Sequence, residues 1–319
     1  MSFNLLFENL TNPALLFFFL GIAAVQFKSD LEIPQNSSKF ISLYLLLSIG
    51  FKGGHELAHS PLGTDIIWIL LFGVILAIVI PLQVFFLVKK RLGIHNSGAV
   101  AAAYGSVSAV TFVTSVAFLE MHKIEFGGHM VAVMALMEAP SIIVGISLIS
   151  LFKKDNTVTM PLKTILYHSF TNGSVLLILG SLLIGFLASD AQAEGIKPFT
   201  TDIFKGFLAV FLLDMGITSG KKLSSFRKEG WFPFAVAVVI PLINGSVVAF
   251  IARWMNLSIG DGFLFAILAA SASYIAVPAA MKMAVPKANP GIYIPMAIGV
   301  TFPINITFGI PIYYQIISM

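Results

Sequence analysis

Apolar runs long enough to cross a lipid bilayer follow one another along almost the whole chain. A helix needs about 20 such residues to span roughly 30 Å of hydrocarbon. Hydrophobic residues make up 57% of the 319 positions and charged residues only 11%. The sequence therefore predicts an all-α membrane protein with ten transmembrane helices. The expected spans are 12–27, 39–54, 65–88, 96–119, 127–152, 164–189, 200–218, 231–255, 260–282 and 291–317.

The remaining composition excludes several classes of site. The chain has no Cys, which rules out disulfides, thiolate metal sites and Cys nucleophiles. The net charge is +4, but Lys and Arg are scattered among short loops, so we expect no nucleic-acid partner. No Lys or Arg precedes the first apolar run and no small-residue cleavage pattern follows it, so we expect that run to remain in the mature protein.

Short matches between the two halves of the chain indicate a duplication. Three stretches recur in the same order at offsets of 160 to 166 residues. A unit with five crossings places its second copy upside down, so we expect two inverted repeats, 1–152 and 164–319, joined by a linker at 153–163. The matches are Gly50 and Gly54 with Gly216 and Gly220, 80–82 with 240–242, and 105–108 with 270–273.

Loop charges predict the orientation in the membrane. Loops after the odd-numbered spans carry 14 Lys and Arg residues, and the loops on the opposite side carry 4. Cytoplasmic loops retain the positive residues. Both termini are therefore expected outside, and the linker 153–163 in the cytoplasm.

The fourth and ninth spans each carry a cluster of small and hydroxyl residues near half depth, at 104–111 and 270–278. Gly105 weakens the first helix, and Pro278 removes an amide from the second. We therefore expect two discontinuous helices that cross at the membrane centre. The N-terminal ends of their second halves would meet there, and together they would offset about one negative charge.

These two clusters are interpreted as an anion-binding site. Apart from the phenols of Tyr104 and Tyr274, no ionisable side chain lies within 98–116 or 262–280, which favours an anion over a cation or a proton. The alternative is that Ser and Gly at this spacing only allow close helix packing. Hydroxyl donors and free amides would come from Ser106, Ser108, Ser271 and Ser273.

Two carboxylates are predicted inside spans, Glu138 in the fifth and Asp214 in the seventh. Buried ionised carboxylates usually have a partner or a task. Thr301 and Asn305 lie at the repeat position that matches Glu138, and oxygens from this set could hold a sodium ion or only pin helices together. Asp214 lies close in sequence to two lysines, so a helix-end ion pair is its alternative role.

The stretch His55-Glu56-Leu-Ala-His59 matches the pattern of zinc proteases. A zinc site needs both histidines on one helical turn and a third ligand. Pro61 follows closely, so we expect this stretch to be the frayed outer end of the second span, and Asp214 is expected on the far side of the membrane. The zinc metalloprotease remains the alternative from a different class. The other histidines, among them His129, are expected near the surface.

Five stretches together resemble the sodium-dependent bicarbonate transporter family best known from cyanobacteria. They follow the family's order, and the likeness spans nearly the whole chain. The resemblance implies sodium-coupled symport of bicarbonate across a bacterial inner membrane, with symport of another small monovalent anion as the alternative, and no cofactor besides the coupling ion. The stretches are 47–54, 104–109, 137–140, 272–279 and 299–305.

The resemblance also implies an elevator mechanism, a homotrimer, a core domain from spans three to five and eight to ten, and a gate domain from spans one, two, six and seven. A PII-like regulator is implied by analogy, although the linker here has about a dozen residues where cyanobacterial members have a long insertion. The implied bicarbonate site maps onto Gly105, Ser106, Val107, Ser108, Ser271, Ala272 and Ser273. The implied sodium site maps onto Thr111, Glu138, Thr301 and Asn305, with Asp214 as a further candidate from the residues themselves.

Overall fold

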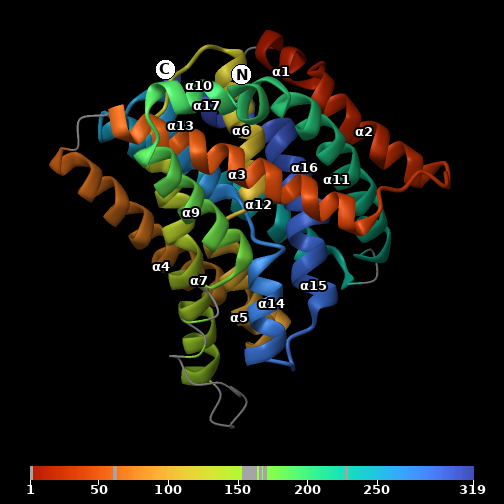
Figure 1. The fold of residues 1–319 in the computed structure, drawn as a ribbon. Coiled ribbons are helices and arrows are strands. Elements are labelled where there is room, and N and C mark those ends of the chain that lie inside the picture. Colours follow the sequence, from red (N-terminus) through yellow and green to blue (C-terminus); the bar gives the residue numbers. More distant parts are fainter. Residues whose placement is uncertain (1–2, 60–62, 153–163, 165–166, 168–170, 227–228) are drawn as a thin grey trace.

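The computed structural model describes residues 3–59, 63–152, 164, 167, 171–226 and 229–319. Among them every regular element is a helix and there is no strand (Figure 1). The predicted linker 153–163, and most of the start of the predicted sixth span, lie outside the described residues.

The helices of the first half follow the predicted spans closely. The fourth span forms two helices, and a short helix that was not predicted precedes the first span. The bounds are α1 Phe3–Leu10, α2 Pro13–Gln26, α3 Gln35–His59, α4 Thr64–Leu92, α5 Ile94–Gly105, α6 Ala109–Met121 and α7 His129–Phe152.

The second half is also helical, and its ninth span likewise forms two helices. A further unpredicted helix, α10, follows α9, and the last span is one long helix that contains π-helical turns. The bounds are α9 Gly173–Leu187, α10 Asp190–Lys197, η1 Pro198–Asp202, α11 Phe204–Phe226, α12 Trp231–Trp254, α13 Ile259–Ala270, α14 Ala276–Ala284, α15 Pro290–Ile294, η3 Pro295–Thr301, α16 Phe302–Ile304, η4 Asn305–Gly309 and α17 Ile310–Ser318.

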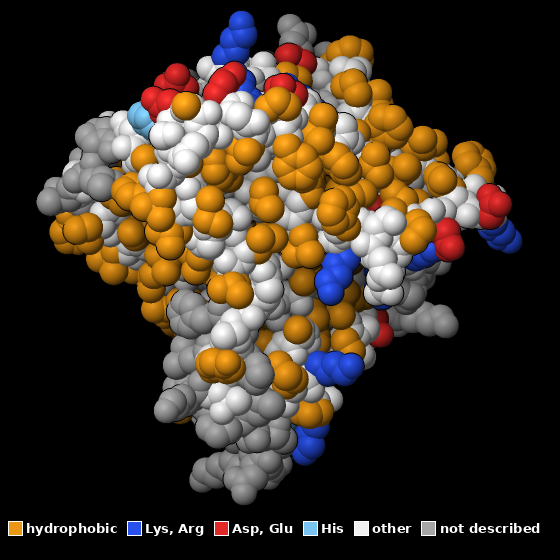
Figure 2. Space-filling model, viewed as in Figure 1, with side chains coloured by type: hydrophobic (Ala, Val, Ile, Leu, Met, Phe, Trp, Pro, Cys, Tyr) orange, Lys and Arg blue, Asp and Glu red, His pale blue; other side chains and the backbone are white. Residues whose placement is uncertain are grey.

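Six helices in the described part of the chain are long and apolar enough to cross a bilayer, and three shorter apolar helices accompany them. Large apolar side chains such as Trp68 on α4 and Phe250 on α12 are more than half exposed. They belong to a broad apolar surface, and acidic and basic side chains lie along its top edge, at its right-hand edge and toward its lower end (Figure 2). A soluble surface does not expose so much contiguous apolar area, so the chain is a multi-pass membrane protein.

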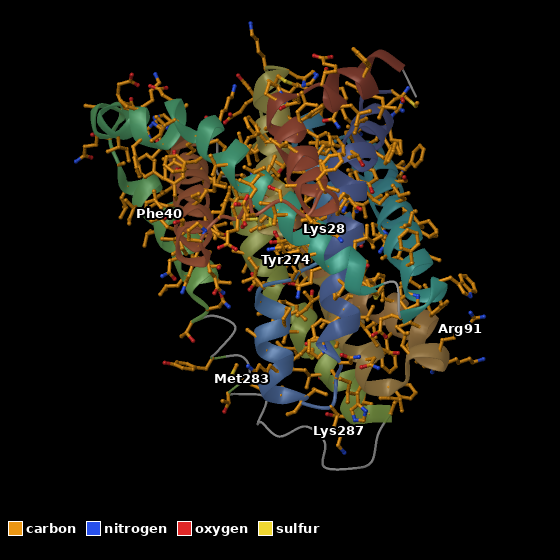
Figure 3. All side chains as sticks on the ribbon, turned by 90° about the vertical axis from the view of Figure 1, so that its right-hand side faces the viewer. Lys28, Phe40, Arg91, Tyr274, Met283 and Lys287 are labelled. Atoms are coloured by element: carbon orange, nitrogen blue, oxygen red, sulfur yellow. The ribbon has the colours of Figure 1, made fainter. Side chains whose placement is uncertain are left out.

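Both termini lie at one end of the molecule, and Arg91, Met283 and Lys287 lie toward the other (Figures 1 and 3). Tyr274, at the second predicted break, lies near half height between them (Figure 3). The predicted break in the ninth span is therefore placed at mid-depth.

Two helix pairs pack with their backbones in contact, α3 on α9 and α2 on α11. A Cβ added at Gly54 would lie 1.9 Å from the carbonyl oxygen of Leu182 on α9. A Cβ added at Gly216 would lie 2.0 Å from the carbonyl oxygen of Phe18 on α2. Only glycine permits these approaches. The glycines that recur between the halves thus do the same packing task in both pairs.

A second group of helices surrounds the two interrupted spans: α4 and α7 pack on α5, while α12 and α17 pack on α13. The extra helix α1 is joined to this group by Asn9, whose Nδ2 donates to the carbonyl oxygens of Ile306 (2.9 Å) and Thr307 (3.1 Å). These carbonyls belong to the π-helical segment η4, so Asn9 satisfies acceptors that the irregular helix leaves available.

Candidate functional site

Both predicted interruptions are present. Helix α5 ends at Gly105, and Ser106 and Ser108 have extended backbone before α6 begins at Ala109. Helix α13 ends at Ala270, and Ser271 is likewise extended. Helix α14 begins only at Ala276. Each interrupted span therefore offers a helix N-terminus in its interior.

The two breaks touch each other through hydrogen bonds. The amide of Ser108 donates to Oγ of Ser271 at 3.0 Å. The amide of Ser273 donates to the carbonyl oxygen of Ala103, at the end of α5, at 2.8 Å. Segments more than 160 residues apart in the sequence are thus held against one another at the point where both helices are open.

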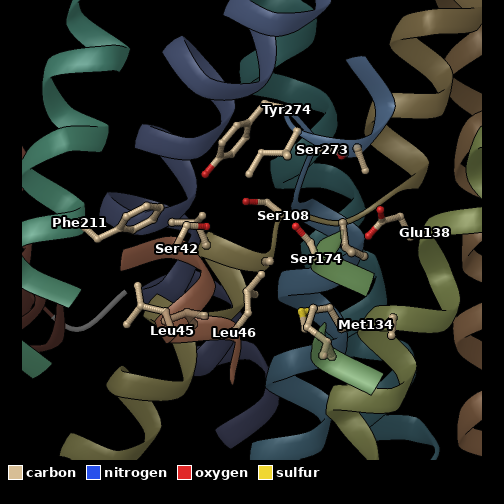
Figure 4. Close-up of a pocket in the computed structure, with 18 residues that line it drawn as sticks. Ser42, Leu45, Leu46, Ser108, Met134, Glu138, Ser174, Phe211, Ser273 and Tyr274 are labelled. Atoms are coloured by element: carbon tan, nitrogen blue, oxygen red, sulfur yellow. The ribbon is translucent and has the colours of Figure 1, made fainter. Parts of the chain in front are cut away.

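A small cavity of about 30 Å³ lies against this contact (Figure 4). Val107, Ser108 and Ser273 line it from the breaks, and Glu138 lines it from α7. Gly105, Ser106, Ser271 and Ala272 do not line it. The opposite wall comes from α3, α9 and α11, with Ser42, Ser174 and Phe211 facing the same space. A cavity of this size has room for one or two water-sized groups.

The first residues of both second half-helices border this cavity, Ala109 and Val110 of α6 and Ala276 of α14. Amides in the first turn of a helix have no acceptor within that helix. In α6 the amide of Thr111 is satisfied by Oγ of Ser108 at 3.2 Å. The positive ends of two helices therefore point at one small space lined by hydroxyls, an arrangement that attracts an anion.

The amides of all four predicted serines donate to groups of the protein, so they are not the free donors that the sequence suggested. Besides the two contacts above, the amide of Ser106 donates to Ala102 and that of Ser271 to Leu268. The backbone donors that border the cavity are those of the two helix starts, which the sequence also led us to expect at this point.

Glu138 is the carboxylate at this cavity. The residue is 8% exposed, and its Oε1 has no hydrogen-bond partner among the described residues. It also borders a second space of about 210 Å³, lined by Asn172 and Met283. Thr111 is buried on α6 and lines neither space, and its Oγ1 likewise lacks a partner within the described chain. Unpartnered buried oxygens of this kind fit a cation such as sodium.

The other predicted cation ligands lie in other contacts. Oγ1 of Thr301 donates to the carbonyl oxygen of Ala237 and shares a hydrogen bond with the hydroxyl of Tyr104, both at 2.7 Å. Nδ2 of Asn305 donates to the carbonyl oxygen of Ala270 at 2.7 Å, at the last residue before the second break. These two residues fasten the last span to the interrupted helices, and neither lines the cavity.

Asp214 lines a larger cavity of about 580 Å³, where it accepts a hydrogen bond from Ser38. This cavity shares Ser42, Phe211 and Tyr274 with the small one, so the two adjoin. Its wall also includes Lys39, Lys221 and Lys222. The structure therefore separates Asp214 from Glu138 and places it in an approach lined by lysines.

The two histidines of the protease-like motif lie in the last turns of α3, which ends at His59, so the motif stands at the end of the helix and is itself helical. Asp190 approaches both: its Oδ1 is 3.5 Å from Nε2 of His55 and 3.0 Å from Nε2 of His59. Asp214, the acid weighed as a third ligand, contacts Ser38 instead. The two histidines thus have a third neighbour with a ligand atom, Asp190, which the sequence analysis did not identify.

Comparison with known proteins gives one family. A family model described as the Na+-dependent bicarbonate transporter superfamily matches residues 13–318. No curated protein matches the chain.

Proposed function

Because the chain belongs to the Na+-dependent bicarbonate transporter superfamily, a family of transporters and not of enzymes, we propose that it carries bicarbonate into the cell together with sodium. The family supports bicarbonate and sodium as the transported ions. It gives no support to a protease acting through His55, Glu56 and His59.

The observation that carries the proposal is the small cavity between the breaks. Two helix N-termini and the hydroxyls of Ser108 and Ser273 attract an anion, while the buried carboxylate of Glu138 repels it. A sodium ion near Glu138 and Thr111 would remove this repulsion and add its own attraction for the anion. Each ion would then bind weakly alone and more tightly together, which is the thermodynamic requirement for coupled transport.

The size of the cavity favours a small solute. A volume of about 30 Å³ suits a planar anion of a few atoms better than a large organic acid. Another small monovalent anion fits the same donors, and it remains the alternative substrate.

The architecture we propose has ten crossings in two inverted five-helix repeats. Three observations support it: each half has one interrupted span, the two breaks contact each other, and glycines recur in both close helix pairs. Helices α2, α3, α9 and α11 would form the gate domain, and the helices around the breaks would form the core domain. Both cavities lie between these groups, as an elevator that slides the core along the gate would require.

The orientation follows from the lysines. The larger cavity opens along Lys39, Lys221 and Lys222, which the charge distribution assigns to the cytoplasm. We therefore interpret this conformation as open to the inside, with both termini outside a bacterial inner membrane. Lysines along the approach would also concentrate the anion. A homotrimer and a PII-like regulator complete the proposal by analogy with the family.

Uptake into proteoliposomes tests the proposal. Purified protein should accumulate labelled bicarbonate when a sodium gradient points inward, and much less when potassium or choline replaces sodium. Uptake that is indifferent to sodium would refute the coupling. Competition by unlabelled bicarbonate, nitrate, formate and chloride distinguishes bicarbonate from another small anion as the substrate. Bicarbonate should compete best, and a stronger competitor would favour the alternative anion.

A further inference from the structure

A polar cluster on the gate helices lies apart from both cavities. It consists of His55 and His59 on α3 and Asp190, the first residue of α10. One ligand atom from each residue lies within 4.8 Å of the others. We propose that these three side chains bind a divalent transition-metal ion of the Zn²⁺ class, a site that neither the family nor the proposed transport mechanism requires.

The two histidines are oriented as metal ligands. They are four residues apart on one helix, so both rings lie on the same face, with centroids 4.6 Å apart. Nδ1 of His59 lies 2.9 Å from the carbonyl oxygen of His55. If Nδ1 carries the proton, it donates to this carbonyl and Nε2 keeps its lone pair for a metal. Nε2 is the atom of each ring that faces Asp190.

Asp190 is held in place by local structure. Ser189 caps α10, and a reciprocal hydrogen bond with Gln192 completes a capping box, which fixes the helix start. The preceding helix, α9, packs closely against α3, since a Cβ at Gly185 would lie 2.0 Å from the carbonyl oxygen of Phe51. Backbone packing on one side and the cap on the other thus place the carboxylate beside the histidines before any metal binds.

The chemistry of the set favours zinc. Two imidazole nitrogens and one carboxylate oxygen suit Zn²⁺, whereas Mg²⁺ and Ca²⁺ prefer oxygen ligands alone. The side chain of Asp190 is 81% exposed, which leaves room for a water as fourth ligand.

A metal at this position would fasten α10 to α3. Helix α10 belongs to the connection between α9 and α11. The ion would therefore tie this connection to α3 and stabilise the outer end of the proposed gate domain. It would act within that domain and would not link it to the core. The expected effect is on stability, with little effect on the transport rate.

The test uses protein without a polyhistidine tag, treated with a chelator and then titrated with ZnCl₂ by calorimetry. We expect one zinc per chain, and a thermal midpoint that rises with zinc but not with MgCl₂. His59→Ala and Asp190→Asn should weaken binding by more than about 100-fold. Glu194→Gln is the matched control, since this acid lies on the same helix but pairs with Lys197, and it should bind zinc as the wild type does.

Binding of Co²⁺ tests the metal site independently of zinc. Co²⁺ should produce the visible absorption of a four-coordinate ion in the wild type and not in the His55→Ala/His59→Ala variant. Equal zinc binding by this variant and the wild type would overturn the proposal, as would the absence of zinc binding by the wild type. Bicarbonate uptake by His59→Ala in metal-free buffer should equal that of the wild type, so this result stands apart from the proposed function.

Discussion

The two interrupted spans are equivalent in the sequence, yet they are built differently. Helix α6 starts behind a side-chain cap, Ser108, and its core-facing residues are buried. Helix α14 starts at Ala276, and its N-cap residue Ile275 has no side-chain cap; Oγ of Ser273 accepts from the amide of Val277 at a longer 3.4 Å. Ile275 is 47% exposed and lines the large cavity. The first break is therefore the fixed half of the site, and the second is the half that meets the approach from the lysine-lined side.

The helices behind the breaks differ in the same way. Gly105 lies against the ring of Pro81 so closely that an added Cβ would be 2.0 Å from its Cγ. At the matching position in the second half of the chain stands Ala270, and the space for its methyl group is provided by Gly245. In the first contact the glycine is on the interrupted helix, and in the second it is on the neighbouring helix. Close contact is thus kept in both, with the tighter fit at the first break.

The largest expected effect comes from changing the cap of the first break. Ser108→Asp keeps an oxygen that can cap α6 but adds a negative charge to the cavity. We expect bicarbonate uptake to fall by about 100-fold or more, since a hydroxyl donor is replaced by a carboxylate that repels the anion at close range. Ser115→Ala is the control, because that hydroxyl bonds only to the carbonyl of Thr111 one turn away. Uptake by Ser108→Asp at the wild-type rate would remove this residue from the site.

The difference in fit predicts unequal effects on stability. Gly105→Ala should destabilise the protein by about 1–3 kcal/mol, because the methyl group must displace a proline ring. Ala270→Gly should cost only about 0.5–1 kcal/mol through added backbone freedom. Thermal midpoints in detergent measure the two, and a larger drop for Ala270→Gly would show that the breaks are not packed as described.

A smaller effect is expected from the contact between the breaks. Ser271→Ala would leave the amide of Ser108 without its acceptor, although the side chain of Ser271 does not line the cavity. Loss of one such bond, about 0.5–1.5 kcal/mol, should raise KM for bicarbonate about two- to tenfold with little change in maximal rate. Ser271→Thr keeps the hydroxyl and should restore KM. An unchanged KM in the alanine variant would mean that the crossing does not position the anion donors.

Local signals in the sequence were enough to locate both breaks. Gly105 and Pro278 act on the backbone of their own helix, so their effect can be read without knowing what surrounds them. The glycines shared by the halves likewise predicted a duplication before their packing role was known. The apolar runs gave most helix ends to within about five residues, although α11 continues eight residues past its predicted end, and the short helices α1 and α10 were not predicted.

Contacts between distant segments could not be predicted in this way. Asp190 is more than 130 residues from His55, and only the packing of α9 on α3 brings them together. His129, expected at the surface, is 7% exposed because its ring lies beside Asp261 of α13, 3.6 Å away. The assignment of Thr301 and Asn305 as sodium ligands stays a prediction, since their hydrogen bonds depend on where the last span docks.

The smallest expected effect comes from an ion pair near the C-terminal end of α6. Lys52 of α3 pairs with Glu120 near the end of α6, and no ion pair ties α14 to another element among the residues described. If α6 moves with the core and α3 stays with the gate, this pair must separate in every transport cycle.

Both side chains are about a quarter exposed, so the pair should contribute no more than about 1 kcal/mol. Lys52→Met removes an attraction that must be broken in each cycle and should therefore raise the maximal uptake rate by about two- to fivefold, with KM unchanged. The exchange Lys52→Glu/Glu120→Lys should restore both the wild-type rate and its sensitivity to added choline chloride, because screening weakens an exposed pair. A rate that does not respond to Lys52→Met, together with a lower thermal midpoint, would instead place α3 and α6 in one rigid body and contradict the division into gate and core.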